Sequence, residues 1–226
     1  LSTGAVSALS YGLIIVLIPS STLMIESVFI TPLSEASDKG GLMRQILNGI
    51  FIISLPVTFF MCAYADSIVK MAFERGVFTA GSTKMTAEAL RYFSIAIPAL
   101  FVGPVSIRLF QILEKIGNVT VVTFATVALN ALLNFLFLKL GWGIKGLALA
   151  SSISWYGAAA GFFFFLRRLE IRAVTRRVFL VMLIAAGVSA AALAASFAVP
   201  VPAETTLGLV IRGITFLCIT LGLYFL

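Results

Sequence analysis

Apolar runs as long as a membrane is thick constrain this chain more than any other feature. A helix needs about 20 apolar residues to cross roughly 30 Å of hydrocarbon. Seven runs approach or exceed that length, at roughly 5–33, 42–66, 84–113, 118–139, 145–166, 177–199 and 205–226. Helices satisfy their own backbone in lipid, and the alternating pattern of a barrel strand is absent. We therefore predict an all-α polytopic membrane bundle of about seven transmembrane helices.

Composition agrees with a membrane protein and excludes most enzyme classes. Charged residues make up 11% of the chain and the mean hydropathy is +1.12, whereas soluble domains are about a quarter charged. The sequence has no histidine, and its two cysteines, Cys62 and Cys218, lie in apolar runs. It has no P-loop, dinucleotide fingerprint or nucleophile elbow. We expect a membrane protein that is not an enzyme, with no catalytic residues, metal or organic cofactor, and no nucleic-acid partner.

One basic segment predicts the orientation in the membrane. The stretch RRLEIRAVTRR (Arg167 to Arg177) holds five of the sixteen basic residues. Positive loops stay in the cytoplasm and attract anionic lipid headgroups, so this loop and the loops at 34–41 and 114–117 should be cytoplasmic. Phe73 to Thr83 should then be extracytoplasmic. The chain starts at Leu1 without a basic leader, and we expect a fragment whose upstream part is missing.

Four prolines lie well inside the first three apolar runs, away from their ends: Pro19, Pro56, Pro98 and Pro104. Each removes a backbone donor and tends to kink its helix. They are either the ordinary prolines of membrane helices or bends in helices that line a cavity of changing shape.

Two charged residues within apolar runs are candidates for substrate binding. Glu26 either lines a cavity that takes a cation, a proton or a polar substrate, or reaches the membrane interface. Arg108 either extends to lipid headgroups or binds a phosphate group through its planar fork of donors. The two side chains could also pair with each other.

Other polar and small residues suggest contacts between helices. Asn130 and Asn134 share a helix face, and they either hydrogen-bond to a neighbouring helix or contribute oxygens to a cation site. The sequence GAAAG at 157–161 predicts a close helix–helix contact. Glu88 and Arg91 are predicted to pair locally, and residues 79–83 offer N-caps for the helix that follows.

Four segments resemble the MurJ/MviN family of lipid II flippases, in the superfamily that also holds polysaccharide flippases and MATE exporters. They are STGAVSALSYGLIIVLIPSS with ITPLSEAS, FERGVFTAGSTKMTAEALRYFSIAIPALF, RLFQILEKIGNVTVV, and ALNALLNFLF with GIKGLALASSIS. The resemblance covers residues 2–168. It implies that 1–168 form the second lobe of a MATE-like core, incomplete at its N-terminus, and that 169–226 form two additional C-terminal helices.

The family resemblance implies a mechanism and a set of binding residues. Members move an undecaprenyl-pyrophosphate-linked sugar across the bacterial inner membrane by alternating access of a central cavity between two lobes. This chain would therefore need the missing N-terminal lobe as its partner. Arg108 matches a family arginine, and Asn130, Asn134 and Ser151 match positions of a sodium site in some members. Sodium or proton coupling is thus implied.

The departures from the family pattern leave other transport functions open. A substrate-contacting arginine of the family is replaced by Ile14, which favours a flippase of another polyprenyl-linked glycan, such as an exopolysaccharide or O-antigen unit. A MATE-like exporter of cations or drugs is a further alternative, supported by Glu26. A membrane scaffold without transport activity is the last.

Overall fold

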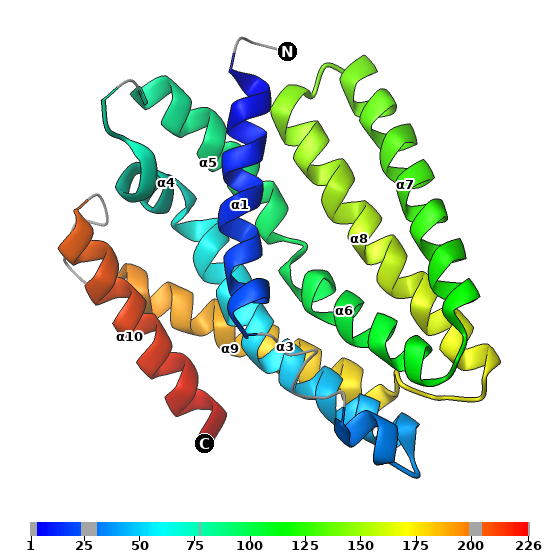
Figure 1. Cartoon of the computed structure of the whole chain (residues 1–226). Coiled ribbons are helices and arrows are strands. Elements are labelled where there is room, and N and C mark those ends of the chain that lie inside the picture. The colour runs from blue at the N-terminus through cyan, green and yellow to red at the C-terminus, as the bar shows by residue number, and fades with distance from the viewer. Residues whose placement is uncertain (1–3, 24–30, 77, 199–204, 226) are drawn as a thin grey trace.

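The computed structural model describes residues 4–23, 31–76, 78–198 and 205–225, and every regular element among them is a helix (Figure 1). A short helical stretch at 31–35 precedes α3. The main helices are α1 (Ala5–Leu23), α3 (Lys39–Ala63), α4 (Ala65–Phe73), α5 (Ala80–Ser94), α6 (Ile97–Ile112), α7 (Ile116–Lys139), α8 (Gly143–Arg168), α9 (Arg176–Phe197) and α10 (Thr206–Phe225). The predicted all-α architecture is confirmed.

Five of the described helices, α3, α7, α8, α9 and α10, are long and apolar enough to cross a membrane. Helices α5 and α6 pass the same test as a pair, although they meet at an angle of 51°. Helix α1 is a shorter apolar helix. The prediction of about seven spans therefore agrees with the described helices, and the chain is a multi-pass membrane protein.

The run at 84–113 was predicted as one span that its prolines tend to kink, and it consists of two helices that meet at 51°. The helix breaks between Ser94 and Ile97, because Pro98 has no N–H to donate to a carbonyl one turn earlier. Helix α8 supplies replacement donors. Ser152 Oγ donates to the Tyr92 carbonyl at 2.8 Å and Tyr156 Oη donates to the Ile95 carbonyl at 2.8 Å. Hydroxyls of a neighbouring helix thus satisfy the broken span in lipid. The other three prolines lie inside continuous helices, Pro19 in α1, Pro56 in α3 and Pro104 in α6.

The segment predicted as a loop from Phe73 to Thr83 is shorter than expected. Helix α4 ends at Phe73 and α5 begins at Ala80, with Thr79 as its N-cap, as predicted, accepting from Ser82 N. Gly76 turns the chain at φ +57°, a conformation that glycine adopts without a Cβ penalty.

This turn brings two aromatic rings onto α1. The Phe73 and Phe78 ring centroids lie 4.9 and 5.8 Å from that of Tyr11. The connection between α4 and α5 therefore packs against α1 at Tyr11. These contacts explain why a phenylalanine lies on each side of the glycine.

Charge pairing near this end also differs from the prediction. Arg91 forms an ion pair with Asp66 of α4, and its Nε donates to the Cys62 carbonyl at 3.2 Å. It does not pair with Glu88, so the predicted local pair within α5 is wrong. The reason is tertiary, since Arg91 points toward the α3–α4 junction, which carries both of its acceptors.

The predicted close contact at the GAAAG sequence is confirmed. A Cβ added to Gly157 would lie 2.9 Å from Leu129 Cδ2, and one added to Gly161 would lie 3.2 Å from Val122 Cγ2. Both partners belong to α7, so two small residues let α7 approach α8 closely. Beyond α8, α7 contacts mainly α6, and Figure 1 shows it at the edge of the bundle.

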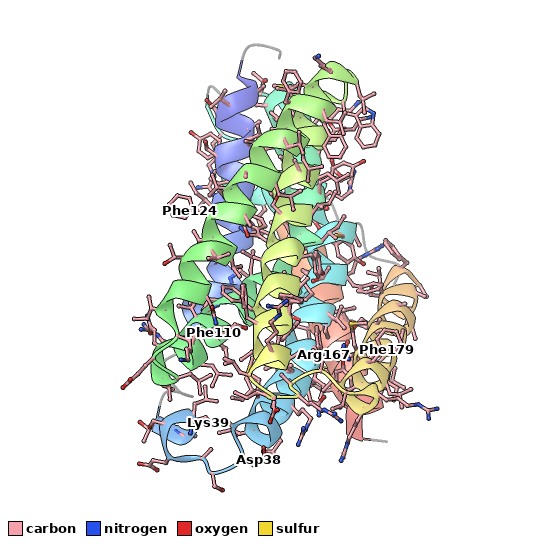
Figure 2. All side chains as sticks on the ribbon, turned by 90° about the vertical axis from the view of Figure 1, so that its right-hand side faces the viewer. Asp38, Lys39, Phe110, Phe124, Arg167 and Phe179 are labelled. Atoms are coloured by element: carbon pink, nitrogen blue, oxygen red, sulfur yellow. The ribbon has the colours of Figure 1, made fainter. Side chains whose placement is uncertain are left out.

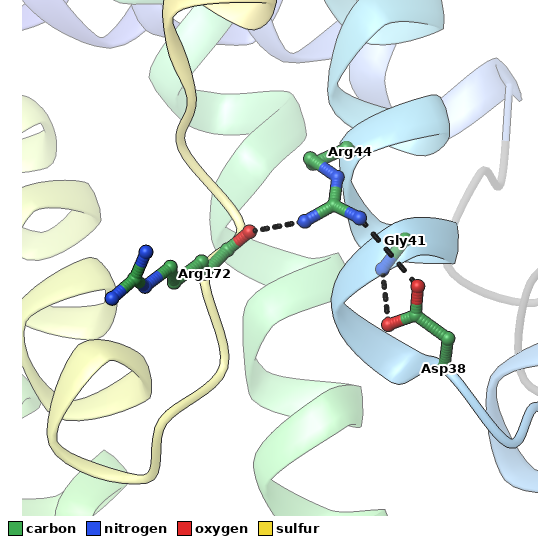
Figure 3. A network of polar contacts seen from close by, with 4 residues as sticks. All are labelled: Asp38, Gly41, Arg44 and Arg172. Carbon is green, nitrogen blue, oxygen red and sulfur yellow. Dashed lines mark hydrogen bonds and ion pairs between the residues drawn. The ribbon is translucent and has the colours of Figure 1, made fainter.

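The three loops that the sequence places on one side of the membrane gather at one end of the bundle (Figure 1), which we call the basic end because it holds the five arginines of 167–177. The connections before α3, between α6 and α7, and between α8 and α9 all lie at the lower end in Figure 1. Arg44 bridges two of them, because its Nη1 donates to the Arg172 carbonyl at 3.0 Å and its Nη2 lies 3.5 Å from Asp38 Oδ2 (Figure 3). Asp38 also caps α3 by accepting from Gly41 N at 2.7 Å. This basic end matches the loops that the sequence places on one side of the membrane.

Candidate functional site

An open, mainly apolar groove lies between α1, α6, α7 and α8. Its volume is about 320 Å³, and Thr123, Thr126 and Trp155 are the lining residues with polar side-chain atoms. We call it the central groove. Its other lining residues are Leu17, Ala99, Leu100, Gly103, Pro104, Ile107, Val122, Val127, Ala158 and Phe162. Helix α1 exposes Tyr11, Ile14 and Ile18 near the groove's Leu17.

Arg108 continues the α6 face that lines the central groove. It follows Pro104 by four residues, so the two side chains lie on one helix face. The side chain is half-buried, and its Nη1 donates to Gln111 Oε1 at 2.9 Å. The two ion pairs among the described residues involve Arg44 and Arg91, so the Arg108 charge has a neutral partner there. Glu26, the other predicted substrate contact, lies outside the described residues.

The predicted cation ligands come together between α7 and α8. Asn134 Nδ2 donates to Asn130 Oδ1 at 3.0 Å, and Asn130 Nδ2 donates to Ser151 Oγ at 3.3 Å. Ser151 in turn donates to the Leu147 carbonyl at 3.2 Å. Within the described part of the chain, Asn134 Oδ1 is buried and accepts no hydrogen bond. The cluster therefore links two helices and leaves one buried oxygen available to a donor or a cation.

The asparagine cluster and the central groove share one face of α7. Thr126, which lines the groove, precedes Asn130 by four residues, and Asn134 follows by four more. A stripe of oxygen-bearing side chains therefore runs from the groove along α7. These are the oxygen ligands that hard cations accept, although no carboxylate is among them.

A second apolar groove, of about 370 Å³, lies between α3 and α10. We call it the α3–α10 groove. Aromatic and aliphatic side chains form both walls, with Phe60 and Phe216 at a centroid distance of 5.6 Å. Its lining residues are Ile52, Ile53, Pro56, Val57, Phe60, Gly213, Phe216, Leu217, Thr220, Leu221 and Tyr224.

Arg212 lies directly before Gly213 of this groove and was not among the predicted site residues. Its guanidinium carbon lies 6.0 Å from the centroid of the Tyr64 ring and 5.9 Å from that of Phe197, within reach of a cation–π contact. Tyr64 Oη also lies 2.8 Å from Ser196 Oγ. A charge within an apolar run was the signal that identified Arg108, and the same signal was present at Arg212.

These features define a multi-pass α-helical membrane protein with open apolar grooves and charged residues beside them. The family model "Lipid II flippase MurJ" matches residues 1–217. The chain belongs to the lipid II flippase MurJ family, as its motifs suggested.

Known relatives agree with this family. The probable lipid II flippase MurJ of Rickettsia prowazekii (strain Madrid E) is 26% identical over 164 residues, which are 68% of this chain and 32% of that protein. The probable lipid II flippase MurJ of Rhizobium tropici is 25% identical over 174 residues, 73% of this chain and 32% of that protein. The matched part therefore spans about a third of either relative.

A solved structure shares the fold. The chain superposes on a lipid II flippase MurJ in an inward closed conformation with a TM-score of 0.86 at 16% sequence identity. The match covers 99% of this chain and 47% of that protein. The helical arrangement described above is thus found in about half of a flippase of this family.

Proposed function

We propose that this chain forms part of a flippase that carries an undecaprenyl-pyrophosphate-linked peptidoglycan precursor, lipid II, across the bacterial inner membrane. The observation that carries the proposal is the family match along residues 1–217. The chain spans only about half of the solved family structure, so transport requires the other lobe of the protein. Residues 1–168 would belong to the flippase core and 169–226 would be the additional helices.

Arg108 is the residue that we assign to the pyrophosphate. It lies on the face of α6 that lines the central groove, and its described partner is the neutral amide of Gln111. A guanidinium can exchange such a partner for two phosphate oxygens and form two parallel, charge-assisted hydrogen bonds. We place the other lobe opposite this groove, so that Arg108 faces the enclosed cavity. Glu26 is assigned to the same cavity on sequence grounds alone.

The α3–α10 groove supplies a place for the polyprenyl chain of the substrate. Its walls are almost entirely apolar, and it lies at the surface that meets lipid. A chain that stays in this groove avoids crossing the polar cavity together with the sugar. The headgroup would then move between the lobes while the tail remains in hydrocarbon.

We assign cation coupling to the cluster of Asn130, Asn134 and Ser151. The support is the buried Asn134 Oδ1, which accepts no described hydrogen bond, beside the oxygens of the other two side chains. Amide and hydroxyl oxygens without a carboxylate bind a monovalent cation weakly. Sodium is the coupling ion that fits these oxygens, whereas proton coupling would need an ionisable group such as Glu26.

The orientation that accompanies this function places the basic end in the cytoplasm. The linker from Arg167 to Arg177 and the network around Arg44 lie at that end, and positive loops remain cytoplasmic. The aromatic turn between Phe73 and Thr83 then faces outward.

A flippase of another polyprenyl-linked glycan is the second candidate. The observation that favours it is Ile14, which stands where the family resemblance expects an arginine. Its side chain is 55% exposed, one turn of α1 before Leu17 of the central groove. An exposed apolar side chain there lowers the positive charge that meets the pyrophosphate. The substrate headgroup could then differ from that of lipid II.

Complementation tests the proposal. The full-length gene is expressed in cells depleted of their own lipid II flippase, and growth is compared for wild type, Arg108→Gln and Arg108→Lys, with Arg168→Gln as the control. Because loss of one charge-assisted contact costs about tenfold or more, we expect Arg108→Gln to lose rescue while Arg108→Lys retains part of it and Arg168→Gln all of it. If the wild type reaches the membrane and fails to rescue, lipid II is not its substrate.

A further inference from the structure

A third apolar groove lies between α8 and α9, on a part of the chain that the proposed transport mechanism does not use. Its volume is about 220 Å³, and α3 and α6 close its inner side. We call it the α8–α9 groove. The side chains that matter for its shape are Phe51, Val102, Ala159, Phe163, Val178 and Phe179. Its walls carry almost no polar surface, so it suits a hydrocarbon chain.

Arginines stand at the end of this groove that lies nearest the basic end. Arg167 follows Phe163 by four residues on the same face of α8, and Arg176 precedes Phe179 by three on α9. Both arginines are exposed. Figure 2 shows Arg167 and Phe179 on the same side of the molecule, close to the linker between the two helices.

The neighbouring arginine behaves differently. The guanidinium carbon of Arg168 lies 4.7 Å from the centroid of the Phe164 ring, and Phe164 does not line the groove. Arg168 therefore lies at the same end of α8 as Arg167 and carries the same charge, but its side chain lies over Phe164, away from the groove. The pair offers a matched comparison of charge with and without the groove.

We propose that the α8–α9 groove and Arg167 together bind an anionic phospholipid from the leaflet at the basic end. One acyl chain lies between Phe163 and Phe179, and Arg167 donates to the phosphate through its planar fork. The site does not depend on the transport function proposed above. It holds a membrane lipid where α9 joins the rest of the bundle.

Charge selects the occupant. The eleven residues from Arg167 to Arg177 contain five arginines and one carboxylate, Glu170. A basic side chain held close to the lipid phosphate strengthens the binding of an anionic lipid by about 1 kcal/mol, or about fivefold, and in this site that side chain is Arg167. A zwitterionic phospholipid fills the same groove without this gain, so the site should prefer phosphatidylglycerol to phosphatidylcholine.

Native mass spectrometry of the purified full-length protein in detergent tests this site. Phosphatidylglycerol and phosphatidylcholine are added separately, and the bound fraction is measured for wild type, Arg167→Gln, Arg167→Lys and Arg168→Gln. We expect Arg167→Gln to weaken phosphatidylglycerol binding about fivefold. Arg168→Gln should stay near wild type, and Arg167→Lys should keep part of the binding, because lysine retains the charge but lacks the planar fork. Phosphatidylcholine binding should not change.

Each other result overturns the proposal. Equal losses for Arg167→Gln and Arg168→Gln would show attraction by the whole basic segment without a site. Equal binding of the two lipids by wild type would exclude recognition of charge, and retention of neither lipid would exclude the site altogether. Each variant is first checked for a monodisperse gel-filtration peak, so that misfolding is not read as lost binding.

Discussion

Helices α6 and α7 follow each other in the chain and are similarly apolar, yet the structure uses them in opposite ways. Helix α6 buries nine of its 16 residues against α3 and α8. Helix α7 buries only Val122 and Phe137 among its 24, and Phe124 is 73% exposed. Hydropathy therefore reports that a helix lies in the membrane and says nothing about whether protein or lipid surrounds it.

The difference has a physical basis. Lipid tails are as apolar as leucine, so burial against protein gains no hydrophobic free energy in a membrane, and helices associate through close packing and polar contacts. Helix α6 packs on several sides, whereas α7 depends on the small-residue face of α8 and on the asparagine cluster. Substitutions should thus be costly in α6 and tolerated over most of α7.

The largest effect is expected for a matched pair of phenylalanines, one on each helix (Figure 2). Phe110 is fully buried, with its ring centroid 5.7 Å from that of Phe162. In a micelle, moving the removed atoms out of the protein interior changes the free energy little. The cost of the substitution therefore comes mainly from the cavity that it leaves, at about 24 cal/mol per Å³. For roughly 100 Å³ it predicts a loss of about 2 kcal/mol for Phe110→Ala. Phe124→Ala should stay within about 0.5 kcal/mol of wild type.

Reversible unfolding of the purified protein in mixed micelles measures both values. Equal losses for the two variants would contradict the contrast between α6 and α7. They would mean that the exposed face of α7 packs against protein, as it would if the other lobe covered it.

The sequence was sufficient for the membrane class and for most spans, because long apolar runs have few alternatives in lipid. It indicated a kink at each of four prolines and did not predict that the helix would break at Ser94–Ile97 in particular. Pro98 indicated a weak point, but Pro19, Pro56 and Pro104 lie within continuous helices. What differs at Pro98 is the pair of hydroxyls on α8 that satisfy the open carbonyls, and this depends on tertiary packing.

The candidate site was predictable in part for the same reason. The spacing of Asn130 and Asn134 places them on one helix face, and the resemblance to the family added Ser151, which the structure brings within hydrogen-bonding distance of Asn130. The pairing of Arg91 with Asp66 could not be predicted, since 25 residues and a helix junction separate them. The grooves combine residues from as many as four helices, so no local pattern identifies them.

A smaller effect is expected where α7 turns into α8. A Cβ added to Gly146 would lie 2.8 Å from the Cβ atoms of Phe137 and Trp142, and Cβ atoms cannot rotate away. Overpacking of this kind costs about 1–3 kcal/mol, and the higher helix propensity of alanine returns up to about 1 kcal/mol. Gly146→Ala should therefore lose about 1 kcal/mol in the same unfolding measurement. Gly187→Ala on α9 is the control, because its added Cβ would meet nothing within 4 Å. If Gly187→Ala lost as much stability as Gly146→Ala, the measurement would report helix flexibility and not the fit of α7 on α8.

The smallest effect concerns an exposed contact in the packed part of the molecule. The Arg91 and Asp66 side chains are 46% and 62% exposed, so water screens their attraction and a coupling of about 0.5 kcal/mol is expected. A double-mutant cycle with Arg91→Gln and Asp66→Asn measures it, and a second cycle with Arg91→Gln and Glu88→Gln should give nearly zero. The coupling should also fall as salt is raised. A coupling energy above about 2 kcal/mol that does not respond to salt would mean that water is excluded from the Arg91–Asp66 pair. The stability of this tightly packed part of the bundle would then depend on polar contacts as much as on the close packing of helices such as α6.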